Sequence, residues 1–340
     1  MLKAAYCTRR IPKYVMKTLL SGPIRPRAGD LVLAKILAPR RQKHLALANG
    51  HKSLLHKDEY VILCYGNRYA PDQFEAYVPD QLEPCQIVSQ DGIAAKLHSR
   101  QHPPAHLSAE IKPLGLVGDE SGRPLNIKDW MTQHNPGTNH SPYTIAVVGS
   151  DADSGQTTAS AQLMAGLNRA GLQVGAAKVT GTTAPQNNGC QTNPSGHVSQ
   201  DQPECSAASP SLRKQQQLAV MLDALISELC TRDVEVIVLE LSECLDLQPD
   251  SLLASEHFTR HINAIIVTSR NVLQAKAGID WLMQKKLPVR AVSGVLMASP
   301  MLAKQARKMI ALPALDGKAL SSPDIISLLD DSGLDSAHQG

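Results

Sequence analysis

One short stretch of the sequence, GSDADSGQTT at residues 149–158, has the composition of a phosphate-binding loop. Glycine-rich loops of this kind turn successive backbone N–H groups toward phosphate oxygens when they join a strand to the start of a helix. The stretch therefore predicts a nucleotide-binding site. The predicted binding residues are Gly149, Ser150, Asp151, Asp153, Ser154, Gly155, Gln156, Thr157 and Thr158.

Two positions of this stretch depart from the usual pattern of such loops. Gly149 and Gly155 are one residue further apart than usual, so Ser150 stands where the first glycine is normally found. Gln156 replaces the lysine that normally brings positive charge to the β- and γ-phosphates. Losing one preorganised electrostatic group typically lowers a rate by about 10²–10³. The sequence leaves open whether the loop binds nucleotide weakly, supports catalysis, or is only a structural turn.

A hydroxyl and an acid are candidates for holding a metal ion beside the loop. Thr157 stands at the position of the hydroxyl that binds Mg²⁺ in these loops. Glu240 follows the apolar residues 234–239, and a carboxylate at the end of a strand is suited to hold the water shell of that ion. Glu243 is an alternative acid. The expected ligands are therefore Mg²⁺ and ATP, with Thr157 and Glu240 on the metal.

Alternating strands and helices are expected to position these residues. Apolar runs predict strands at 143–149, 173–181, 234–241, 263–269 and 289–296. Helical spacing of apolar residues predicts helices at 157–171, 212–230, 250–261, 272–286 and 301–310. This alternation is typical of a parallel sheet covered on both faces. The predicted fold class is α/β, with a doubly wound, mostly parallel P-loop NTPase-like domain preceded by a small β-rich domain.

The sequence around the loop also resembles a known family. Residues 147–182, VVGSDADSGQTTASAQLMAGLNRAGLQVGAAKVTGT, resemble the P-loop NTPases of the dethiobiotin synthetase and cobyric acid synthase-like group, above all its uncharacterised DUF1611-like branch. In that group the loop resembles G-T-D-x-x-x-G-K-T-T and is followed by a helix and GLRVGxxK. Asp151, Gly155, Thr157 and Thr158 match this loop, and Lys178 matches the lysine that in dethiobiotin synthetase reaches substrate and phosphate.

The resemblance covers roughly residues 143–315 and implies several functional expectations. It implies Lys178 as a catalytic residue, an unknown small-molecule substrate such as a small carboxylate or cofactor precursor, and a homodimer. The polar residues that follow KVTGT depart from the acidic and aromatic residues expected there. Three functions stay open: a weak nucleotide-binding protein, an active ATP-dependent ligase or kinase, and a scaffold that has lost nucleotide binding.

The residues before this domain are expected to form short strands. Runs at 29–37, 44–49, 59–66 and 74–79 are rich in β-prone residues and separated by turn-forming ones, which is typical of a small barrel or a curled sheet. Arg68, Asp72 and Glu75 form either a ligand site or a turn with a local salt bridge.

Turn-forming and polar stretches predict the domain boundaries. The expected divisions are a β-rich domain with a basic N-terminal segment at 1–133, a linker at 134–142, the P-loop NTPase-like domain at 143–320 and a C-terminal helix and tail at 321–340. Residues 182–211 are rich in Ser, Asn, Gln, Pro and Gly, and this composition predicts a disordered loop.

Composition limits the kinds of partner and the location. The 340-residue chain has no apolar run of about 18 residues, so no membrane span is expected. Its seven cysteines form no CxxC pair, which favours a cytoplasmic location. Residues 1–60 carry 13 Lys and Arg against 3 Asp and Glu, but no interleaved stacking aromatics, so a solvated basic face is expected rather than a nucleic-acid site.

His257 and His261 either pair on a metal or are solvent-exposed.

Overall fold

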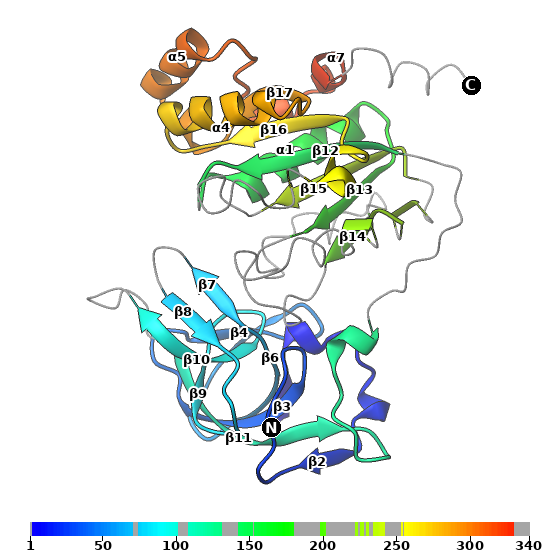
Figure 1. Ribbon diagram of the computed structural model, residues 1–340, viewed down its shortest axis with the longest axis vertical. Coiled ribbons are helices and arrows are strands. Elements are labelled where there is room, and N and C mark those ends of the chain that lie inside the picture. The colour runs from blue at the N-terminus through cyan, green and yellow to red at the C-terminus, as the bar shows by residue number, and fades with distance from the viewer. Residues whose placement is uncertain are drawn as a thin grey trace. The chain divides into compact units, whose positions relative to one another are not determined.

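The computed structural model describes residues 2–70, 74–100, 108–130, 142–151, 153–179, 198–201, 222–223, 225–227, 229–230, 234–241, 253 and 255–329 (Figure 1). The described residues up to 130 form one compact unit, and those from 142 onward form a second. The expected linker at 134–142 falls almost wholly outside the described ranges, so the domain boundary stays a prediction. In the part of the chain that is described, no helix is both long and apolar enough to span a membrane.

The first unit is built on a curled sheet. Its strands are β1 (Leu2–Ala4), β2 (Thr18–Leu20), β3 (Leu31–Ala38), β4 (His44–Ala46), β5 (Lys52–Leu54), β6 (Tyr60–Tyr65), β7 (Arg68–Ala70), β8 (Phe74–Tyr77), β9 (Cys85–Ile87), β10 (Ile93–Arg100) and β11 (Ala109–Gly118). Its 3-10 helices are η1 (Tyr6–Thr8), η2 (Lys13–Val15) and η3 (Ile127–Trp130). Strand β6 pairs with both β3 and β10, so β6, β3, β11, β9 and β10 close into a ring. Leu31, Leu63, Ile87 and Ile111 are fully buried within it.

The longest strand of this unit is not evident from its sequence. The predicted runs correspond to β3, β4, β6 and β8, but β11 was not predicted because Pro113 and Gly115 interrupt its apolar pattern. The pairing of β11 with β3 shifts register between these two residues. Such irregularities accommodate a proline, which has no N–H for the ladder.

The second unit is a parallel sheet with helices on both faces. Its strands are β12 (Tyr143–Gly149), β13 (Val174–Lys178), β14 (Val198–Asp201), β15 (Val236–Leu241), β16 (Ala264–Thr268) and β17 (Val289–Ser293). Its helices are α1 (Gln156–Arg169), α3 (Glu256–Thr259), α4 (Val272–Gln284), η7 (Val295–Ala298), α5 (Pro300–Met309), α6 (Gly317–Leu320) and α7 (Ile325–Leu329). The strand order is β14-β13-β15-β12-β16-β17, and every pair is parallel. The prediction of a parallel α/β sheet is confirmed.

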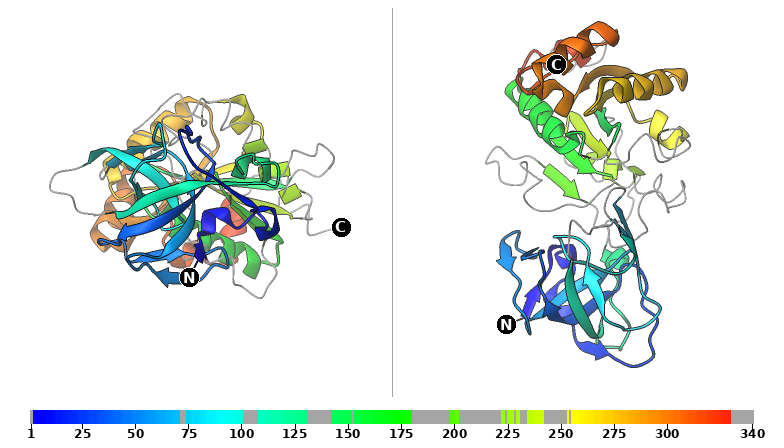
Figure 2. Two further views of the ribbon diagram at one scale, coloured as in Figure 1. Left: turned by 90° about the horizontal axis from the view of Figure 1, so that it is seen from below. Right: turned by 90° about the vertical axis from the view of Figure 1, so that its left-hand side faces the viewer.

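The residues of β12 alternate between the two faces of this sheet. Ile145 and Val147 belong to a buried cluster with Leu163 and Leu167 of α1. Val148 belongs to the opposite cluster, which contains side chains of α4 and α5. Figure 2 shows α1 and α4 on opposite sides of the strands. This burial on both faces explains why the strands read as continuous apolar runs.

Three local features differ from the predictions. Residues 198–201, expected in a disordered loop, form β14 beside β13, because parallel pairing with a sheet edge satisfies their backbone groups. The rest of 182–211 lies outside the described residues. Strand β17 ends at Ser293 because Gly294 adopts a φ of 98° and a 3-10 helix follows. The helix expected at 250–261 is described only over Glu256–Thr259, where the Ser255 side chain caps its first turn.

Candidate functional site

The glycine-rich loop lies at the carboxyl end of β12 and leads directly into α1. Strand β12 lies between β15 and β16. After β12 the chain continues to β13 on one side of the sheet, whereas β16 lies on the other side. In open α/β sheets, ligands bind beyond the carboxyl ends of the strands where the order reverses in this way. The first-turn amides of α1 belong to this loop and are the groups that an anion would meet.

Positive φ angles shape the backbone of this loop. Asp153 has a φ of 55° and Gly155 a φ of 96°. The second value favours glycine, because L residues with a Cβ adopt this conformation only with strain. Gly149 has a different role, since a Cβ there would overlap the side-chain amide of Gln156 and displace it from its place against the loop. Both glycines are therefore explained by the geometry of the loop.

Buried hydroxyl groups attach the loop to the end of β16. Ser150, 1% exposed, donates its Oγ hydrogen to Ser269 Oγ at 2.7 Å and its N–H to the carbonyl of Thr268 at 2.8 Å. Ser154 is fully buried, and its Oγ lies 3.0 Å from Thr268 Oγ1. Val295 donates its N–H to the carbonyl of Ser154 at 3.0 Å. These bonds hold the loop in one conformation, which lowers the entropic cost of binding a ligand.

The residues that anchor the loop at the ends of β16 and β17 were not among those predicted from the sequence. Thr268 and Ser269 form a short polar run directly after the apolar residues of β16, and Gly294 follows β17 in the same way. Their position could have indicated this role, because polar residues at the carboxyl ends of parallel strands lie at the edge of the sheet where ligands bind.

The side chain of Gln156 folds back into the loop. It is 7% exposed, and its Nε2 donates a hydrogen bond of 3.3 Å to the carbonyl of Asp151. The same amide lies against Gly149. The Gln156 carboxamide therefore stabilises the loop through contacts within it and would bring no charge to a bound phosphate.

Three predicted residues meet at one carboxylate oxygen. Thr157 donates its hydroxyl hydrogen to Glu240 Oε1 at 2.6 Å, and Lys178 Nζ lies 2.8 Å from the same atom. The side chains of Lys178 and Glu240 are 10% and 12% exposed. A hydroxyl and a carboxylate are oxygen ligands of the kind that Mg²⁺ prefers, so Thr157 and Glu240 fit the metal role. The alternative acid, Glu243, lies outside the described residues.

The remaining loop side chains lie nearer the solvent. Asp153 and Thr158 are exposed, and Asp151 is half-buried. The Asp151 carboxylate lies 3.3 Å from the Ser150 hydroxyl, whose hydrogen is donated to Ser269 at the shorter distance. Two acidic residues in this loop would oppose the binding of an anion, whereas the positive charge of Lys178 would favour it.

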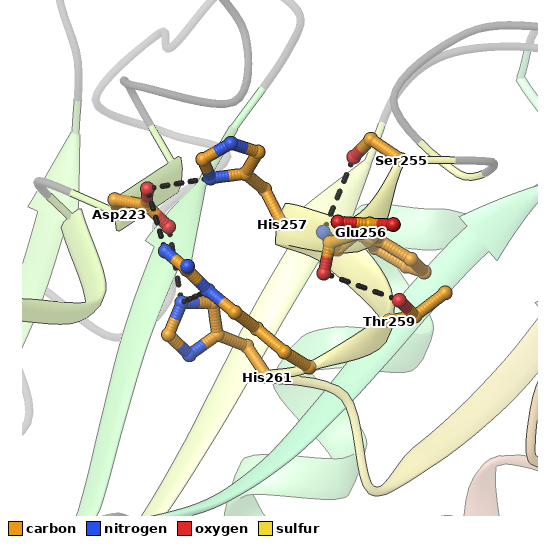
Figure 3. A network of polar contacts seen from close by, with 8 residues as sticks. Asp223, Ser255, Glu256, His257, Thr259 and His261 are labelled. Atoms are coloured by element: carbon orange, nitrogen blue, oxygen red, sulfur yellow. Dashed lines mark hydrogen bonds and ion pairs between the residues drawn. The ribbon is translucent and has the colours of Figure 1, made fainter.

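The histidine pair considered as a metal site surrounds an acid that was not anticipated (Figure 3). His257 Nδ1, Arg260 Nη2 and His261 Nε2 lie 2.8, 2.9 and 3.0 Å from the carboxylate of Asp223. Burial acts to raise the pKa of Asp223, but these hydrogen bonds outweigh it and leave that pKa below its usual value. Burial lowers the pKa of His261, and Asp223 opposes this effect.

These contacts explain the histidines without a metal ion. The carboxylate of Asp223 would be the third ligand of a metal bound by the two histidines, but Arg260 already forms an ion pair with it. Across the described ranges, no three His, Cys, Asp or Glu side chains gather as a metal site.

Of the second candidate cluster, in the first unit, Arg68 and Glu75 lie in the described part of the chain. Arg68 donates to the carbonyl of Val88, and its guanidinium lies 5.4 Å from the ring centre of Phe74. Glu75 instead accepts hydrogen bonds from Tyr77 and Ser99. Asp72 lies outside the described residues. The contacts of Arg68 and Glu75 therefore favour local packing over a shared ligand site.

Comparisons with known proteins give only distant likenesses. No protein-family model matches the chain, and no curated protein matches it. The signal recognition particle receptor FtsY from Elizabethkingia anophelis in complex with GDP is 14% identical over 59% of this chain and 68% of that chain, with a TM-score of 0.38. A nucleotide-binding protein from Archaeoglobus fulgidus in complex with ADP is 15% identical over 55% and 85%, with a TM-score of 0.35.

A third solved structure is similar to the chain at the same level. The signal recognition particle 54 kDa protein from Aeropyrum pernix K1 in complex with GDP is 13% identical over 61% of this chain and 51% of that chain, with a TM-score of 0.36. Matches with TM-scores below 0.5 do not decide what a site binds. The geometry of the loop and its neighbours has to indicate that.

Proposed function

We propose that this protein binds a nucleotide weakly through residues 149–158 and hydrolyses it slowly. The observation that carries the proposal is the meeting of Thr157, Lys178 and Glu240 beside the loop, at the carboxyl ends of adjacent parallel strands. Each comes from a different element, and their roles in phosphate chemistry are complementary. A purely structural turn does not require this combination of hydroxyl, ammonium and carboxylate.

Each part of the site would act on the phosphates in a different way. The backbone N–H groups of 150–156 and the N-terminus of α1 would bind phosphate oxygens. Lys178 would place positive charge on the transferred phosphoryl group. Thr157 and Glu240 would hold Mg²⁺, which neutralises phosphate charge when bound. Gln156 adds no charge, which is why we expect weak binding and slow turnover.

A second candidate is an ATP-dependent ligase or kinase that acts on a small carboxylate or cofactor precursor. Retention of Lys178 beside Glu240 favours it, since this lysine reaches substrate and phosphate in dethiobiotin synthetase, which residues 147–182 resemble. The same resemblance supports placing the protein in that group of P-loop NTPases and supports a homodimer. The seven cysteines, which form no CxxC pair, support a cytoplasmic location. The internal use of the Gln156 side chain favours weak binding over efficient catalysis.

Thermal-shift measurements with ATP, ADP, GTP and GDP, with and without Mg²⁺, test the proposal. A ligand that binds only the folded protein stabilises it by about 2.7 kcal/mol at 100 times its dissociation constant. At least one nucleotide should raise the melting temperature, and Thr157→Val should reduce that shift. The matched control is Thr259→Val, because Thr259 is exposed on α3 and its hydroxyl donates to the carbonyl of Glu256 in the same helix. If no nucleotide stabilises the protein, the scaffold function replaces the proposed one.

A further inference from the structure

The carboxyl ends of α4 and α5 lie at one edge of the parallel sheet. The two helices pack against each other (Figure 1). Helix α4 ends at Gln284, five residues before β17 begins at Val289. Helix α5 ends at Met309, and five residues later Ala314 pairs in parallel with Val292 of β17. Both helix ends therefore lie near the amino end of β17, at the edge of the sheet opposite to the glycine-rich loop.

Each of these helix ends exposes a methionine and two basic side chains. The sequence is MQKK at 283–286 and RKM at 307–309. Met283 is 52% exposed and Met309 is 45% exposed. The basic side chains beside them are exposed as well. We define the helix-end surface as these six residues: Met283, Lys285, Lys286, Arg307, Lys308 and Met309.

Acidic side chains are scarce around this surface. Residues 270–310 contain eight Lys and Arg against one acid, Asp280, in a chain whose net charge is only +3. Asp280 pairs with Lys276, one helical turn before it. Among the residues that the structure describes, no acid forms an ion pair with the four basic side chains of the helix-end surface. Positive charge is therefore concentrated there.

Local helix energetics explain only part of this pattern. Basic residues at the carboxyl end of a helix interact favourably with its dipole, which accounts for Arg307 and Lys308 at the end of α5. The dipole gives no reason for Met283 and Met309 to lie in water, where their apolar area is unfavourable. A ligand that is both anionic and apolar would satisfy both kinds of side chain.

An anionic lipid surface has both properties. Its headgroups attract Lys and Arg, and flexible apolar side chains can enter the boundary between headgroups and acyl chains. Protein interfaces are enriched in aromatic residues and Arg and depleted in Lys, whereas three of the four basic residues here are lysines. Single-stranded nucleic acid stacks on aromatic side chains, and the helix-end surface contains none.

We propose that the helix-end surface binds the anionic headgroups of a lipid bilayer, with the two methionines partly buried in the lipid. The basic side chains supply the attraction, and the methionines supply the apolar contact that a soluble polyanion does not offer. The proposal is independent of the proposed function, because the surface and the glycine-rich loop lie at opposite edges of the sheet.

Cosedimentation of the full chain with lipid vesicles tests the proposal. Vesicles of phosphatidylcholine mixed with phosphatidylglycerol should bind the protein, and vesicles of phosphatidylcholine alone should not. Binding should weaken as the salt concentration rises, because salt screens the attraction between the protein and the headgroups.

A charge variant identifies the surface. Replacing Lys286, Arg307 and Lys308 together by Gln should weaken binding to the mixed vesicles by at least about tenfold, since each basic residue near an anionic lipid surface contributes roughly fivefold. The matched control removes the same charge from the first unit.

That control replaces the exposed residues Lys43, Lys52 and Lys57 together by Gln, and it should change vesicle binding by less than about twofold. Equal losses in the two triple variants would mean that net charge alone attracts the protein, which overturns the proposal. Because every substituted side chain is exposed, both variants should keep the circular dichroism spectrum of the wild type.

A methionine variant separates lipid from other anions. Replacing Met283 and Met309 together by Ser keeps the charge and should weaken vesicle binding by about threefold or more, because less apolar area enters the lipid. Single-stranded oligothymidylate is the nucleic-acid probe, and it should bind less tightly than the mixed vesicles. Unchanged vesicle binding by this variant, tighter binding of the oligonucleotide, or no binding of wild type to the mixed vesicles would each overturn the proposal.

Discussion

Gln156 is the side chain that would set the strength of the proposed phosphate site. Its amide is buried against Gly149 and bonds to the carbonyl of Asp151, so it stabilises the loop from within. A lysine at this position would have a charged end that is poorly satisfied by a single carbonyl. That charge would become favourable when a phosphate enters the loop. The glutamine thus suits a loop that keeps its shape without ligand, and under the proposed function it would leave phosphate binding weak.

The first prediction concerns this residue. Gln156→Lys should tighten the binding of Mg·ATP by about tenfold or more, if the restored contact contributes at least 1.4 kcal/mol. Isothermal titration measures the change. Gln284→Lys adds the same charge at an exposed position near the end of α4 and should have no effect. Equal affinities of Gln156→Lys and wild type would show that the loop does not present its amides to phosphate.

The second prediction concerns Asp91, a buried carboxylate of the first unit. It is 2% exposed, and Ser89 donates a hydrogen bond to it. Burial raises the pKa of Asp91 to about 6, and an electrostatic interaction with Cys7 adds to this, while Ser89 and Arg68 oppose it. The folded protein therefore holds this proton more tightly than the unfolded chain does. Protonation of Asp91 therefore contributes to the free energy of unfolding, fully below pH 3.8, and this contribution is lost as the pH rises through about 6.

Asp91→Asn should remove this pH dependence. A pKa shift of one unit corresponds to about 1.4 kcal/mol. The variant should therefore gain up to roughly 3 kcal/mol in the free energy of unfolding at pH 7.5, and this gain should vanish near pH 4. Urea denaturation across this pH range measures it. Asp80→Asn, in an exposed pair with Arg25, is the control and should change stability by less than about 1 kcal/mol. A gain that does not depend on pH would contradict a raised pKa.

At the scale of elements, the loop depends on the ends of β16 and β17. Ser150 and Ser154 bond to Thr268 and Ser269 at the end of β16. Gly294, after β17, lets the backbone pass close to the carbonyl of Ser154, and a Cβ there would lie 2.7 Å from the N of Ser269. The shape of the glycine-rich loop therefore depends on elements more than 100 residues away in sequence.

The third prediction follows from this close approach. Gly294→Ala should destabilise the second unit and weaken nucleotide binding, because the backbone of the loop must move to admit the methyl group. Gly22→Ala is a matched control, since Gly22 has a φ of 112° but no atom within 4 Å of the added Cβ. The control should show only backbone strain of about 1–3 kcal/mol. Chemical denaturation and titration of both variants decide this, and equal effects would show that the loop does not depend on Gly294.

At the scale of the whole molecule, each compact unit has its own core. One buried cluster draws all its residues from the part of the chain up to 130, and the two clusters that cover the parallel sheet draw theirs from 143 onward. A unit with its own core can fold alone. The candidate site also lies wholly in the second unit.

The fourth prediction is that the two units fold and function separately. Fragments 1–133 and 134–340 should each unfold cooperatively in thermal circular dichroism measurements. The second fragment should bind nucleotide within about threefold of the full chain, because every residue of the candidate site lies within it. An unfolded 134–340 fragment, or one that binds much more weakly, would show that the site depends on the first unit.

Local patterns in the sequence determined the parallel sheet and the loop. The apolar run of β12, the glycines of the loop and the periodicity of α1 depend on neighbours a few residues apart, so they can be recognised without a structure. The type and order of the elements also indicated that Thr157 and Glu240 belong to one end of the sheet. The roles of these residues stay predictions.

Only the tertiary structure decided how the site is joined together. The register that sets Lys178 opposite Glu240, the hydroxyl bonds from Ser150 and Ser154, and the ring closed by β6 and β10 all link residues far apart in the chain. Asp223, the shared partner of His257 and His261, was missed for the same reason. A local pattern states which face of an element is apolar. It does not state which other element covers that face or at which register, because these depend on how all the elements pack at once.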